Sequence, residues 1–343
     1  MSASRPSEII AKDASYACGQ IDFSGLNSKT ILITGATGLL GLHFLACIKH
    51  LVVQKKLRIK VQANIHSEPD TIARYFLKGN HIEIIRGDLS DEEYCHKLLP
   101  ADYILHLAGY AQPNRFMSDA LRTLRINTVG TISLLQKLKP GGKFLFASSA
   151  DVYTGLTSFP FREDQVGTTG PGHPRACYIE GKKTGETACH IYFRNGVDAK
   201  SARLGLIFGP GTRKGDTRVL NSLIEKGLKG SVALLDEGRA RRTFLYVSDA
   251  VQMMWRVLLF GHESIYNVGG KDIVSILELA KMIGSNLNIP VALPENPQSI
   301  PGAPDSVILD VSRFEKEFGP LKLMSFGSAL ERTIEWQRHL YKQ

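Results

Sequence analysis

A glycine-rich loop between two apolar segments is the feature of this 343-residue sequence that most restricts its fold. The loop reads Gly35-Ala36-Thr37-Gly38-Leu39-Leu40-Gly41. The β-branched run before it, residues 30–34, is typical of a buried strand, and the longer apolar run after it, 39–53, is typical of a helix. Glycines at this spacing allow a tight turn, let backbone amides approach a pyrophosphate and let helix and strand pack closely. The loop therefore predicts phosphate binding at the amino end of a helix.

Strands and helices alternate through the first part of the chain. Further strands are predicted at 58–65, 82–85, 103–107, 143–147 and 199–206, and helices at 7–18, 118–138 and 177–195. Alternation at this spacing is typical of βαβ units, whose right-handed crossovers build a parallel sheet with helices on both faces. We therefore expect an α/β fold with a Rossmann-like, doubly wound parallel sheet and a smaller C-terminal substrate-binding lobe.

The sequence divides into a leader, a sheet domain and a second lobe. Residues 1–28 form the leader, and 29–207 form the dinucleotide-binding domain, to which 243–270 is expected to return. The composition changes after Gly209-Pro210-Gly211, so 208–242 and 271–343 are assigned to the substrate-binding lobe. Five prolines between residues 290 and 304 predict a surface loop there.

Composition excludes several classes of protein. The chain has 42 basic and 33 acidic residues, a net charge of +9, but its basic residues are dispersed, which predicts one anion site and no binding of nucleic acid. No apolar run approaches the ~18 residues that a membrane span needs. The cysteines are odd in number and far apart, which indicates neither a disulfide framework nor a zinc site: Cys18, Cys47, Cys95, Cys177 and Cys189. These features predict reduced thiols and a cytoplasmic protein.

The residues after the second and third predicted strands bear on the choice of dinucleotide. Sites of this kind often place an acid after the second strand, where it binds the adenosine ribose. Here the segment Ala63-Asn64-Ile65-His66-Ser67 contains no acid. Asn64 offers a hydrogen bond to a ribose hydroxyl, which favours NAD, whereas His66 and Arg74 suit the 2′-phosphate of NADP. Asp88, after the third strand, is placed either to reach the adenine or to cap the next helix.

Polar residues on one predicted helix and after the fifth predicted strand indicate acid–base chemistry. Tyr178 and Lys182 lie four residues apart and so share one helix face. A neighbouring ammonium favours the phenolate of a tyrosine, which can accept the proton of a substrate hydroxyl while a hydride leaves. Ser149 stands at the sheet edge where ligands bind, and its hydroxyl can share that proton. Asp151 either brings a carboxylate to the same place or caps a turn.

Together these motifs resemble the extended short-chain dehydrogenase/reductase family, the NAD-dependent epimerases and dehydratases that act on nucleotide sugars. The resemblance runs from about Lys29 to the C-terminus. It includes His106-Leu107-Ala108-Gly109, Asn127-Thr128-Val129-Gly130-Thr131, Arg203 to Pro210 and Arg242-Thr243-Phe244-Leu245-Tyr246-Val247. The segment Pro174-Arg175-Ala176-Cys177-Tyr178-Ile179-Glu180-Gly181-Lys182 looks most like the UDP-glucuronate decarboxylase branch.

The resemblance implies transient oxidation of a sugar at C4. Tyr178 would be the base, Lys182 would lower the pKa of that tyrosine and hold the nicotinamide ribose, and Ser149 would orient the 4-hydroxyl. Family members usually dimerise through the helices predicted at 118–138 and 177–195. A homodimer with a four-helix interface is therefore expected.

The resemblance also implies sets of ligand contacts. Arg242 would pair with a phosphate of the nucleotide-diphosphate sugar, and Arg213 and Arg218 are further candidates for substrate binding. The implied cofactor contacts are the glycine loop with Asn64, Asp88, Leu89, Leu107, Ala108, Gly109, Asn127, Ser148, Tyr178 and Lys182. NAD is the expected cofactor, with NADP as the alternative.

Departures from the family pattern bear on the reaction. The 4,6-dehydratases have an acid pair directly after the catalytic hydroxyl, but here the pair is Ala150-Asp151, so dehydration is not expected. Decarboxylases have a glutamate at the second position, and Asp151 keeps its carboxylate one methylene shorter. Leu206 replaces the family's substrate-binding asparagine, and residues 299–305 lack the arginine often found there.

These observations predict an NAD-dependent nucleotide-sugar enzyme. Decarboxylation of a UDP-hexuronate is the leading hypothesis. An epimerase acting at C4, or at C3 and C5, is the alternative. A non-catalytic NAD-binding subunit is the third hypothesis, against which the intact Tyr178 and Lys182 pair argues.

Overall fold

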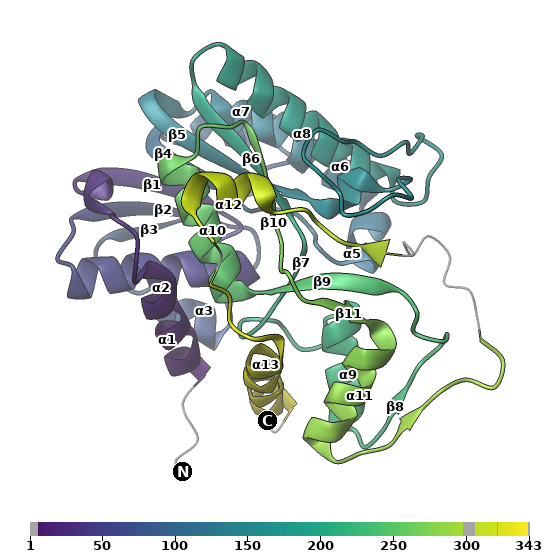
Figure 1. Ribbon diagram of the computed structural model, residues 1–343. Coiled ribbons are helices and arrows are strands. Elements are labelled where there is room, and N and C mark those ends of the chain that lie inside the picture. The colour runs from purple at the N-terminus through teal and green to yellow at the C-terminus, as the bar shows by residue number, and fades with distance from the viewer. Residues whose placement is uncertain (1–5, 298–305, 321, 342–343) are drawn as a thin grey trace.

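A parallel sheet of seven strands lies at the centre of the computed structural model, which describes residues 6–297, 306–320 and 322–341 (Figure 1). Its strands are β1 (Lys29–Thr34), β2 (Ile59–Ile65), β3 (Ile82–Arg86), β4 (Ala101–His106), β5 (Leu138–Ser149), β6 (Asp198–Leu204) and β10 (Ile265–Val268). They lie in the order β10-β6-β5-β4-β1-β2-β3. The order of the strands along the chain reverses at β1, which pairs with both β2 and β4. In such sheets ligands bind beyond the carboxyl ends of the strands at this reversal.

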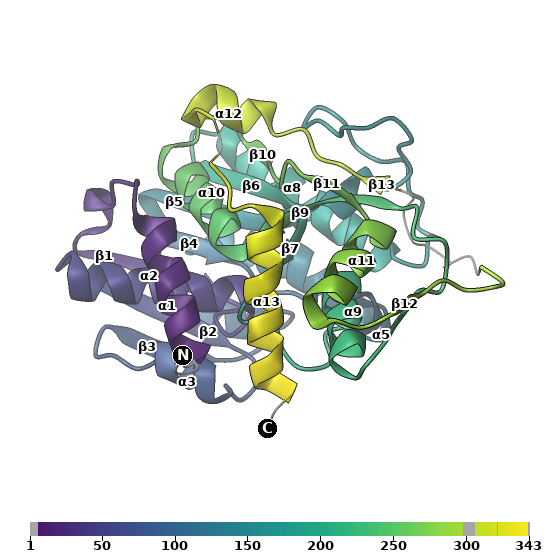
Figure 2. The same ribbon diagram turned by 60° about the horizontal axis from the view of Figure 1, so that its bottom comes forward.

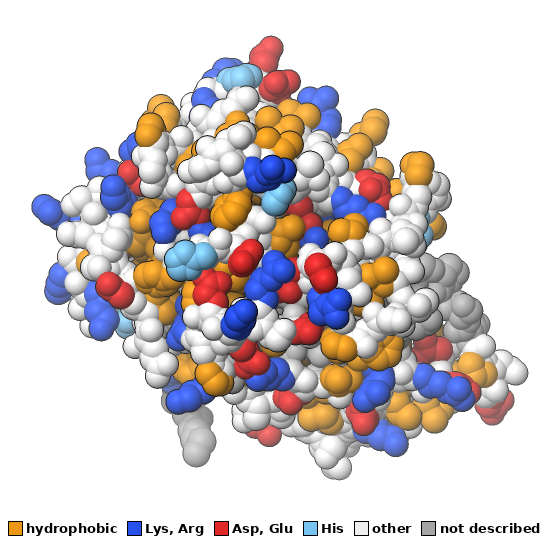
Figure 3. Space-filling view, turned by 45° about the horizontal axis from the view of Figure 1, so that its top comes forward, with side chains coloured by type: hydrophobic (Ala, Val, Ile, Leu, Met, Phe, Trp, Pro, Cys, Tyr) orange, Lys and Arg blue, Asp and Glu red, His pale blue; other side chains and the backbone are white. Residues whose placement is uncertain are grey.

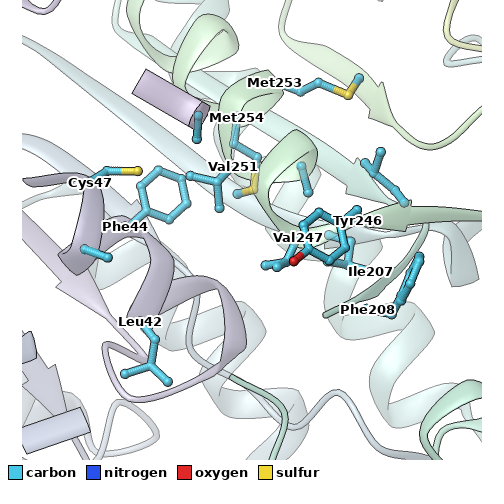
Figure 4. Close-up of a cluster of buried hydrophobic side chains, with 14 of the residues drawn as sticks. Leu42, Phe44, Cys47, Ile207, Phe208, Tyr246, Val247, Val251, Met253 and Met254 are labelled. Carbon is cyan, nitrogen blue, oxygen red and sulfur yellow. The ribbon is translucent and has the colours of Figure 1, made fainter. Parts of the chain in front are cut away.

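Helices cover both faces of the sheet because successive apolar side chains of a strand point to opposite faces. In β1, Ile31 and Ile33 pack with α1 (Pro6–Cys18), α2 (Leu39–Gln54) and α10 (Val247–Phe260). Leu32 packs on the other face, with α4 (Glu92–Lys97), α7 (Thr131–Leu135) and α8 (Ala176–Arg194). Figure 4 shows Phe44 of α2 and Val251 of α10 facing one another in the first of these cores. The arrangement confirms the predicted α/β fold with a doubly wound parallel sheet.

The helix predicted at 118–138 is interrupted and ends earlier than expected. It comprises α5 (Pro113–Ser118), α6 (Ala120–Arg125), a π-helical turn η2 (Ile126–Gly130) and α7. Pro140, and Gly141 with a φ of 71°, cannot continue a helix. The chain therefore leaves the helix at Leu135 and enters β5 at Leu138.

The sixth predicted strand also ends early, at Leu204, so that Leu206 belongs to a second sheet. There β7 (Leu206–Phe208) pairs with β9 (Arg241–Tyr246), which also pairs with β11 (Ile273–Ser275) and β13 (Ser306–Val307). Gly205 lies between the two sheets. A Cβ atom on it would lie in ordinary contact, 3.4 Å from both Leu309 Cδ1 and the Thr243 carbonyl oxygen.

The remaining elements lie mainly beside the second sheet. They are α9 (Val219–Leu228), β8 (Val232–Ala233), α11 (Ile276–Leu287), β12 (Val291–Ala292) and α13 (Phe326–Tyr341), whereas α12 (Ser312–Phe318) packs against β10 of the seven-stranded sheet. Figure 1 shows α9, α11 and β8 gathered at the lower right, away from the seven-stranded sheet, whereas α10 and β10 return to that sheet. The predicted proline-rich loop is described only as far as residue 297, and the whole segment 299–305 discussed above lies outside the described residues.

The leader forms the predicted helix, α1, which packs against α2, α10 and α13. Figure 2 shows α1 and α13 running side by side, although they come from opposite ends of the chain. Asp13 of α1 is buried, accepts a hydrogen bond from the Tyr246 hydroxyl (2.7 Å) and forms an ion pair with Arg332 (2.5 Å). The leader therefore ties the end of β9 to the C-terminal helix.

The surface carries mixed charge. On the face in Figure 3, basic, acidic and hydrophobic side chains lie interspersed. Within the described part of the chain, no helix is both long enough and apolar enough to span a membrane.

Candidate active site

The glycine loop lies at the carboxyl end of β1 and leads into α2. Gly35 has a φ of 64°, and the Gly38 amide donates to the Gly35 carbonyl oxygen (2.9 Å) to close the turn. A Cβ atom on Gly35 would lie 2.8 Å from Ala108 Cα, and one on Gly41 would lie 2.3 Å from the Gly35 oxygen. Side chains at these two positions would displace the backbone, so both glycines are required for this close packing.

The segment after β4 lies directly against the end of β1. Thr34 Oγ1 accepts hydrogen bonds from the amides of Leu107 (3.1 Å) and Ala108 (3.2 Å). The same oxygen lies 2.8 Å from His106 Nδ1. These contacts join residues 106–109, three of which are implied cofactor contacts, to the glycine loop.

Two polar side chains lie near Gly109, whose φ is 140°. A Cβ atom there would lie 3.8 Å from Asn127 Oδ1 and 4.0 Å from Lys182 Nζ. Asn127 is buried and donates to the Thr123 carbonyl oxygen (2.8 Å), but its Oδ1 has no hydrogen-bond partner among the described residues. Gly109 has no side chain, and it lies beside the unpartnered oxygen of Asn127 and the amine of Lys182. This arrangement fits the polar ribose of a dinucleotide.

The residues predicted at the adenosine end lie at the carboxyl ends of β2 and β3. Asn64 is buried and donates to the Tyr94 hydroxyl (2.6 Å). Asp88 accepts a hydrogen bond from the Ser90 amide (2.9 Å) and pairs with Arg122 (3.0 Å). The cap of α4 is Asp91, so the alternative capping role of Asp88 is not found. Leu89 is buried, and its carbonyl oxygen lies against Gly130.

Tyr178 lies in the first turn of α8 and is buried against α5. Its ring stacks on Phe116, with centroids 4.5 Å apart and ring planes 8° from parallel. Burial raises the pKa of Tyr178 to about 12, and the charge of Asp151 adds to the increase. A hydrogen bond with Ser149 and the cations Arg175 and Arg218 oppose it. The phenol and the predicted catalytic hydroxyl are therefore in contact, as the sequence predicts.

Lys182 lies one turn further along α8, beneath the same site. Its Nζ is 5.5 Å from the centroid of the Tyr178 ring and donates to the Ala147 carbonyl oxygen (2.7 Å). Burial lowers the pKa of Lys182 to about 7, although Glu186 opposes this. The ammonium is thus desolvated and turned toward the strand, and the expectation that Lys182 lowers the pKa of Tyr178 stays a prediction.

Asp151 lies in a 3-10 turn, η3 (Ala150–Tyr153), and forms an ion pair with Arg175. Ser149 caps this turn by accepting a hydrogen bond from the Asp151 amide (3.1 Å). Burial raises the pKa of Asp151, while the charges of Arg175, Arg242 and His173 lower it. The carboxylate therefore stands beside Tyr178 within a group of basic side chains.

The three predicted substrate-binding arginines lie in different surroundings. Arg242 is buried on β9, and its charge acts on Asp151. Arg218 pairs with Asp216 (2.6 Å), and its charge acts on Tyr178. Arg213 donates to the Thr37 carbonyl oxygen (3.2 Å), which places it at the glycine loop. Two of the three arginines are thus near the catalytic candidates, and one is near the phosphate-binding loop.

Ser148, predicted as a cofactor contact, is buried beneath the site. Its hydroxyl donates to Glu186 of α8 (2.5 Å). Glu186 in turn accepts two hydrogen bonds from Arg203 of β6. This network joins the end of β5 to the helix that carries Tyr178 and Lys182.

The structure adds two residues that were given no role from the sequence. Phe116 lies 62 positions before Tyr178 and could not be connected with it without the tertiary fold. Arg175 pairs with Asp151, and its guanidinium also lies 5.4 Å from the Phe116 ring centroid. The sequence does place Arg175 three positions before Tyr178, about one helical turn away, and this spacing could have indicated that the two residues lie close together.

Comparison with known proteins connects this site to one family. The model of the NAD dependent epimerase/dehydratase family matches residues 31–269. UDP-glucuronic acid decarboxylase 1 of Danio rerio is 32% identical over 314 residues, which cover 90% of this chain and 72% of that protein. UDP-glucuronic acid decarboxylase 1 of Xenopus tropicalis is 31% identical over 258 residues, 74% of this chain. The matched part is only 59% of that relative's length, less than two thirds.

Solved structures share the fold. A dTDP-glucose 4,6-dehydratase from Streptomyces venezuelae superposes with a TM-score of 0.76 at 22% identity, covering 90% of this chain and 97% of that one. A UDP-glucuronic acid 4-epimerase from Bacillus cereus, solved with UDP-glucuronic acid and NAD, gives a TM-score of 0.73 at 23% identity, with coverages of 91% and 100%. The family description confirms the predictions of an enzyme and of NAD as its cofactor. From the matched family model and the relative that is 32% identical, the chain belongs to the NAD dependent epimerase/dehydratase family.

Proposed function

We propose that this protein is an NAD-dependent nucleotide-sugar enzyme that decarboxylates a UDP-hexuronate. The observation that carries the proposal is the group beside Tyr178, in which Asp151 faces the charges of Arg175 and Arg242. Guanidinium groups bind carboxylates through charge-assisted hydrogen bonds, so this group suits an acidic sugar. The relatives named UDP-glucuronic acid decarboxylase, at 31% and 32% identity, support the same substrate class.

The proposed role of Tyr178 is to hold the proton of the sugar 4-hydroxyl. Ser149, which hydrogen-bonds to the phenol, would orient that hydroxyl. NAD, when bound, supplies the chemistry of accepting a hydride from C4 and returning it later. The residues proposed to hold it are the glycine loop, Asn64, Asp88-Leu89, Leu107 to Gly109, Asn127, Ser148, Tyr178 and Lys182.

Loss of CO2 follows from the position of the ketone. A C4 ketone is β to the C6 carboxylate, so the C5–C6 bond can break with its electron pair delocalised onto the C4 oxygen. Tyr178, which holds the proton taken from the 4-hydroxyl, stabilises that oxygen by a hydrogen bond. Asp151 lies beside Tyr178, and in its protonated form it is the candidate that delivers a proton to C5, becoming a carboxylate.

A C4 epimerase is the second candidate, and one observation favours it. Asp151 is held in an ion pair with Arg175, and a carboxylate occupied in this way is less available for proton transfer. Epimerisation needs only the C4 hydroxyl chemistry of Tyr178 and Ser149. The two reactions differ in carbon count, so their products are distinguishable.

The test is to incubate the protein with NAD in D2O and a panel of nucleotide sugars that includes UDP-glucuronate, and to analyse products by mass spectrometry and proton NMR. A pentose product with loss of CO2 supports decarboxylation. A product of unchanged carbon skeleton supports the epimerase, and deuterium at a ring carbon would place the deprotonation. Absence of any product despite NAD binding would favour the non-catalytic hypothesis.

Two variants connect the activity with the site. Tyr178→Phe should abolish turnover, whereas Tyr192→Phe, on the same helix α8, should not. Full turnover by Tyr178→Phe would overturn the proposed mechanism. Asp151→Asn should slow formation of the pentose product if Asp151 donates the proton to C5, and should leave an epimerase active.

We further propose that the second lobe binds the nucleotide sugar.

We also propose that the protein is a homodimer. Helices α6 and α8 pack together, and apolar side chains on this side are exposed: Leu121 by 78%, Ile191 by 54%, Met117 by 43% and Ile132 by 41%. Sedimentation velocity should show a dimer that Leu121→Glu dissociates. A wild-type protein that sediments only as a monomer would contradict this.

We also propose that the protein is cytoplasmic. All five cysteines are free in the structure, which supports a reducing compartment.

A further inference from the structure

A cluster of charged side chains stands just beyond the carboxyl end of β2, where dinucleotide sites often place an acid. No acid occupies residues 63–67. The first acid after them is Glu68, and its two carboxylate oxygens are bound by different arginines. Arg74 Nη2 lies 2.9 Å from Oε1, and Arg86 Nη2 lies 2.5 Å from Oε2. One carboxylate therefore holds two guanidinium groups together.

Backbone pairing and one arginine place this cluster beside the glycine loop. Arg86 is opposite Ile65 in the β2–β3 register, and the Gly87 amide donates to the Ile65 carbonyl oxygen (3.0 Å). Arg213 donates to the Thr37 oxygen of the glycine loop (3.2 Å), and its Nε lies 4.0 Å from Asp70. The segment from Glu68 to Arg74 thus lies between the end of β2 and the phosphate-binding loop, beside the expected position of the adenosine ribose.

The charges around this position favour an additional anion. Arg74, Arg86 and Arg213 contribute three positive charges, against the carboxylates of Glu68 and Asp70. The next carboxylate, Asp88, is paired with Arg122 (3.0 Å) and has His66 close enough to lower its pKa further. Negative charge on Asp88 is therefore already compensated.

The carboxylate of Glu68 can be replaced on its two arginines by another anion. The side chains of Glu68, Arg74 and Arg86 are each more than half exposed. Exposed ion pairs contribute little to stability because water solvates both partners well. A phosphate monoester carries about −1.5 to −2 charges and three acceptor oxygens, so it competes well with a single carboxylate for two guanidinium groups.

We propose that this site binds NADP(H) as well as NAD(H), with the 2′-phosphate displacing Glu68 from Arg74 and Arg86. Asn64 and the glycine loop serve both dinucleotides, and only these two arginines recognise the added phosphate. Glu68 then acts as a built-in counter-ion that holds the arginines in place when the 2′-phosphate is absent. The proposal rests on the dinucleotide site and on no particular sugar reaction, so failure of the proposed decarboxylation would leave it standing.

The test is direct binding to the full-length protein. NADH and NADPH are titrated separately, followed by their own fluorescence, at two salt concentrations. The proposal predicts a Kd for NADPH within about tenfold of that for NADH, and a steeper loss of NADPH affinity with salt because the extra contact is ionic. A Kd for NADPH more than about tenfold weaker than that for NADH would overturn it.

Variants separate the phosphate contact from the rest of the site. Arg74→Gln with Arg86→Gln should weaken NADPH by about tenfold or more, as expected for two lost charge-assisted contacts, and change NADH by less than about twofold. Arg239→Gln, in an exposed pair with Glu237 on the second lobe, is the matched control and should change neither. Glu68→Gln should strengthen NADPH and leave NADH unchanged. Equal losses for both dinucleotides in the double variant would show that the arginines act on the fold, and would overturn the proposal.

Discussion

Replacing Glu186 with glutamine tests how firmly the buried network holds α8 on the sheet. Arg203 is buried in β6, and its Nε and Nη2 donate to the two carboxylate oxygens of Glu186, both at 2.9 Å. Arg203 Nη1 also donates to the Tyr153 hydroxyl at 2.9 Å. The pair therefore has favourable two-point geometry, and both side chains are almost completely removed from solvent.

The magnitude follows from what the substitution leaves behind. Glu186→Gln keeps the shape of the side chain but leaves a buried guanidinium without the carboxylate it faces. Breaking a buried pair in this way costs about 3–5 kcal/mol of unfolding free energy, a large part of the ~5–15 kcal/mol that a folded protein has. The exposed pair of Glu225 with Lys229 (2.7 Å) gives a matched control, since such pairs contribute about 1 kcal/mol or less.

The assay is urea unfolding, followed by circular dichroism, of the wild type, Glu186→Gln, Glu225→Gln and the double variant Glu186→Gln with Arg203→Met. The double variant should recover part of the loss, because no unpaired charge then remains buried. A loss below about 1 kcal/mol for Glu186→Gln would refute the reasoning. So would a double variant less stable than the single one.

Two further predictions concern the leader and the glycine loop. Burial raises the pKa of Asp13 to about 6, although Arg332 and Tyr246 oppose this. The folded protein thus binds a proton there that the unfolded chain releases, so this stabilisation is complete below about pH 4 and is lost as the pH rises through about 6. Asp13→Asn should reduce the fall in unfolding free energy between pH 4 and 7 by about 3 kcal/mol, measured by urea unfolding across that range; an unchanged slope would contradict the assignment. Gly41→Ala should abolish binding of NADH in a fluorescence titration, because its Cβ would lie 2.3 Å from the Gly35 oxygen; normal affinity would show that the loop can relax.

The fold and much of the site could be predicted because their signals are local. The glycine loop, the strand before it and the helix after it lie within about 25 residues, and their pattern indicates a dinucleotide fold without further information. Tyr178 and Lys182 share a helix face through their spacing alone. The interrupted helix at 113–135 was not predicted, because an apolar pattern does not distinguish a continuous helix from one with a π-helical turn.

By itself, the sequence determined the order of strands and helices, the loop that suits a pyrophosphate and the family to which the chain belongs. Only the tertiary structure decided which charges meet: Arg175 with Asp151, 24 residues away, and Asp13 with Arg332, 319 residues away. It also decided that Lys182 turns toward Ala147 and that Phe116 covers the ring of Tyr178. The physical reason is that secondary structure follows from the periodicity of neighbouring side chains, whereas ion pairs, stacking and desolvation depend on how distant segments pack.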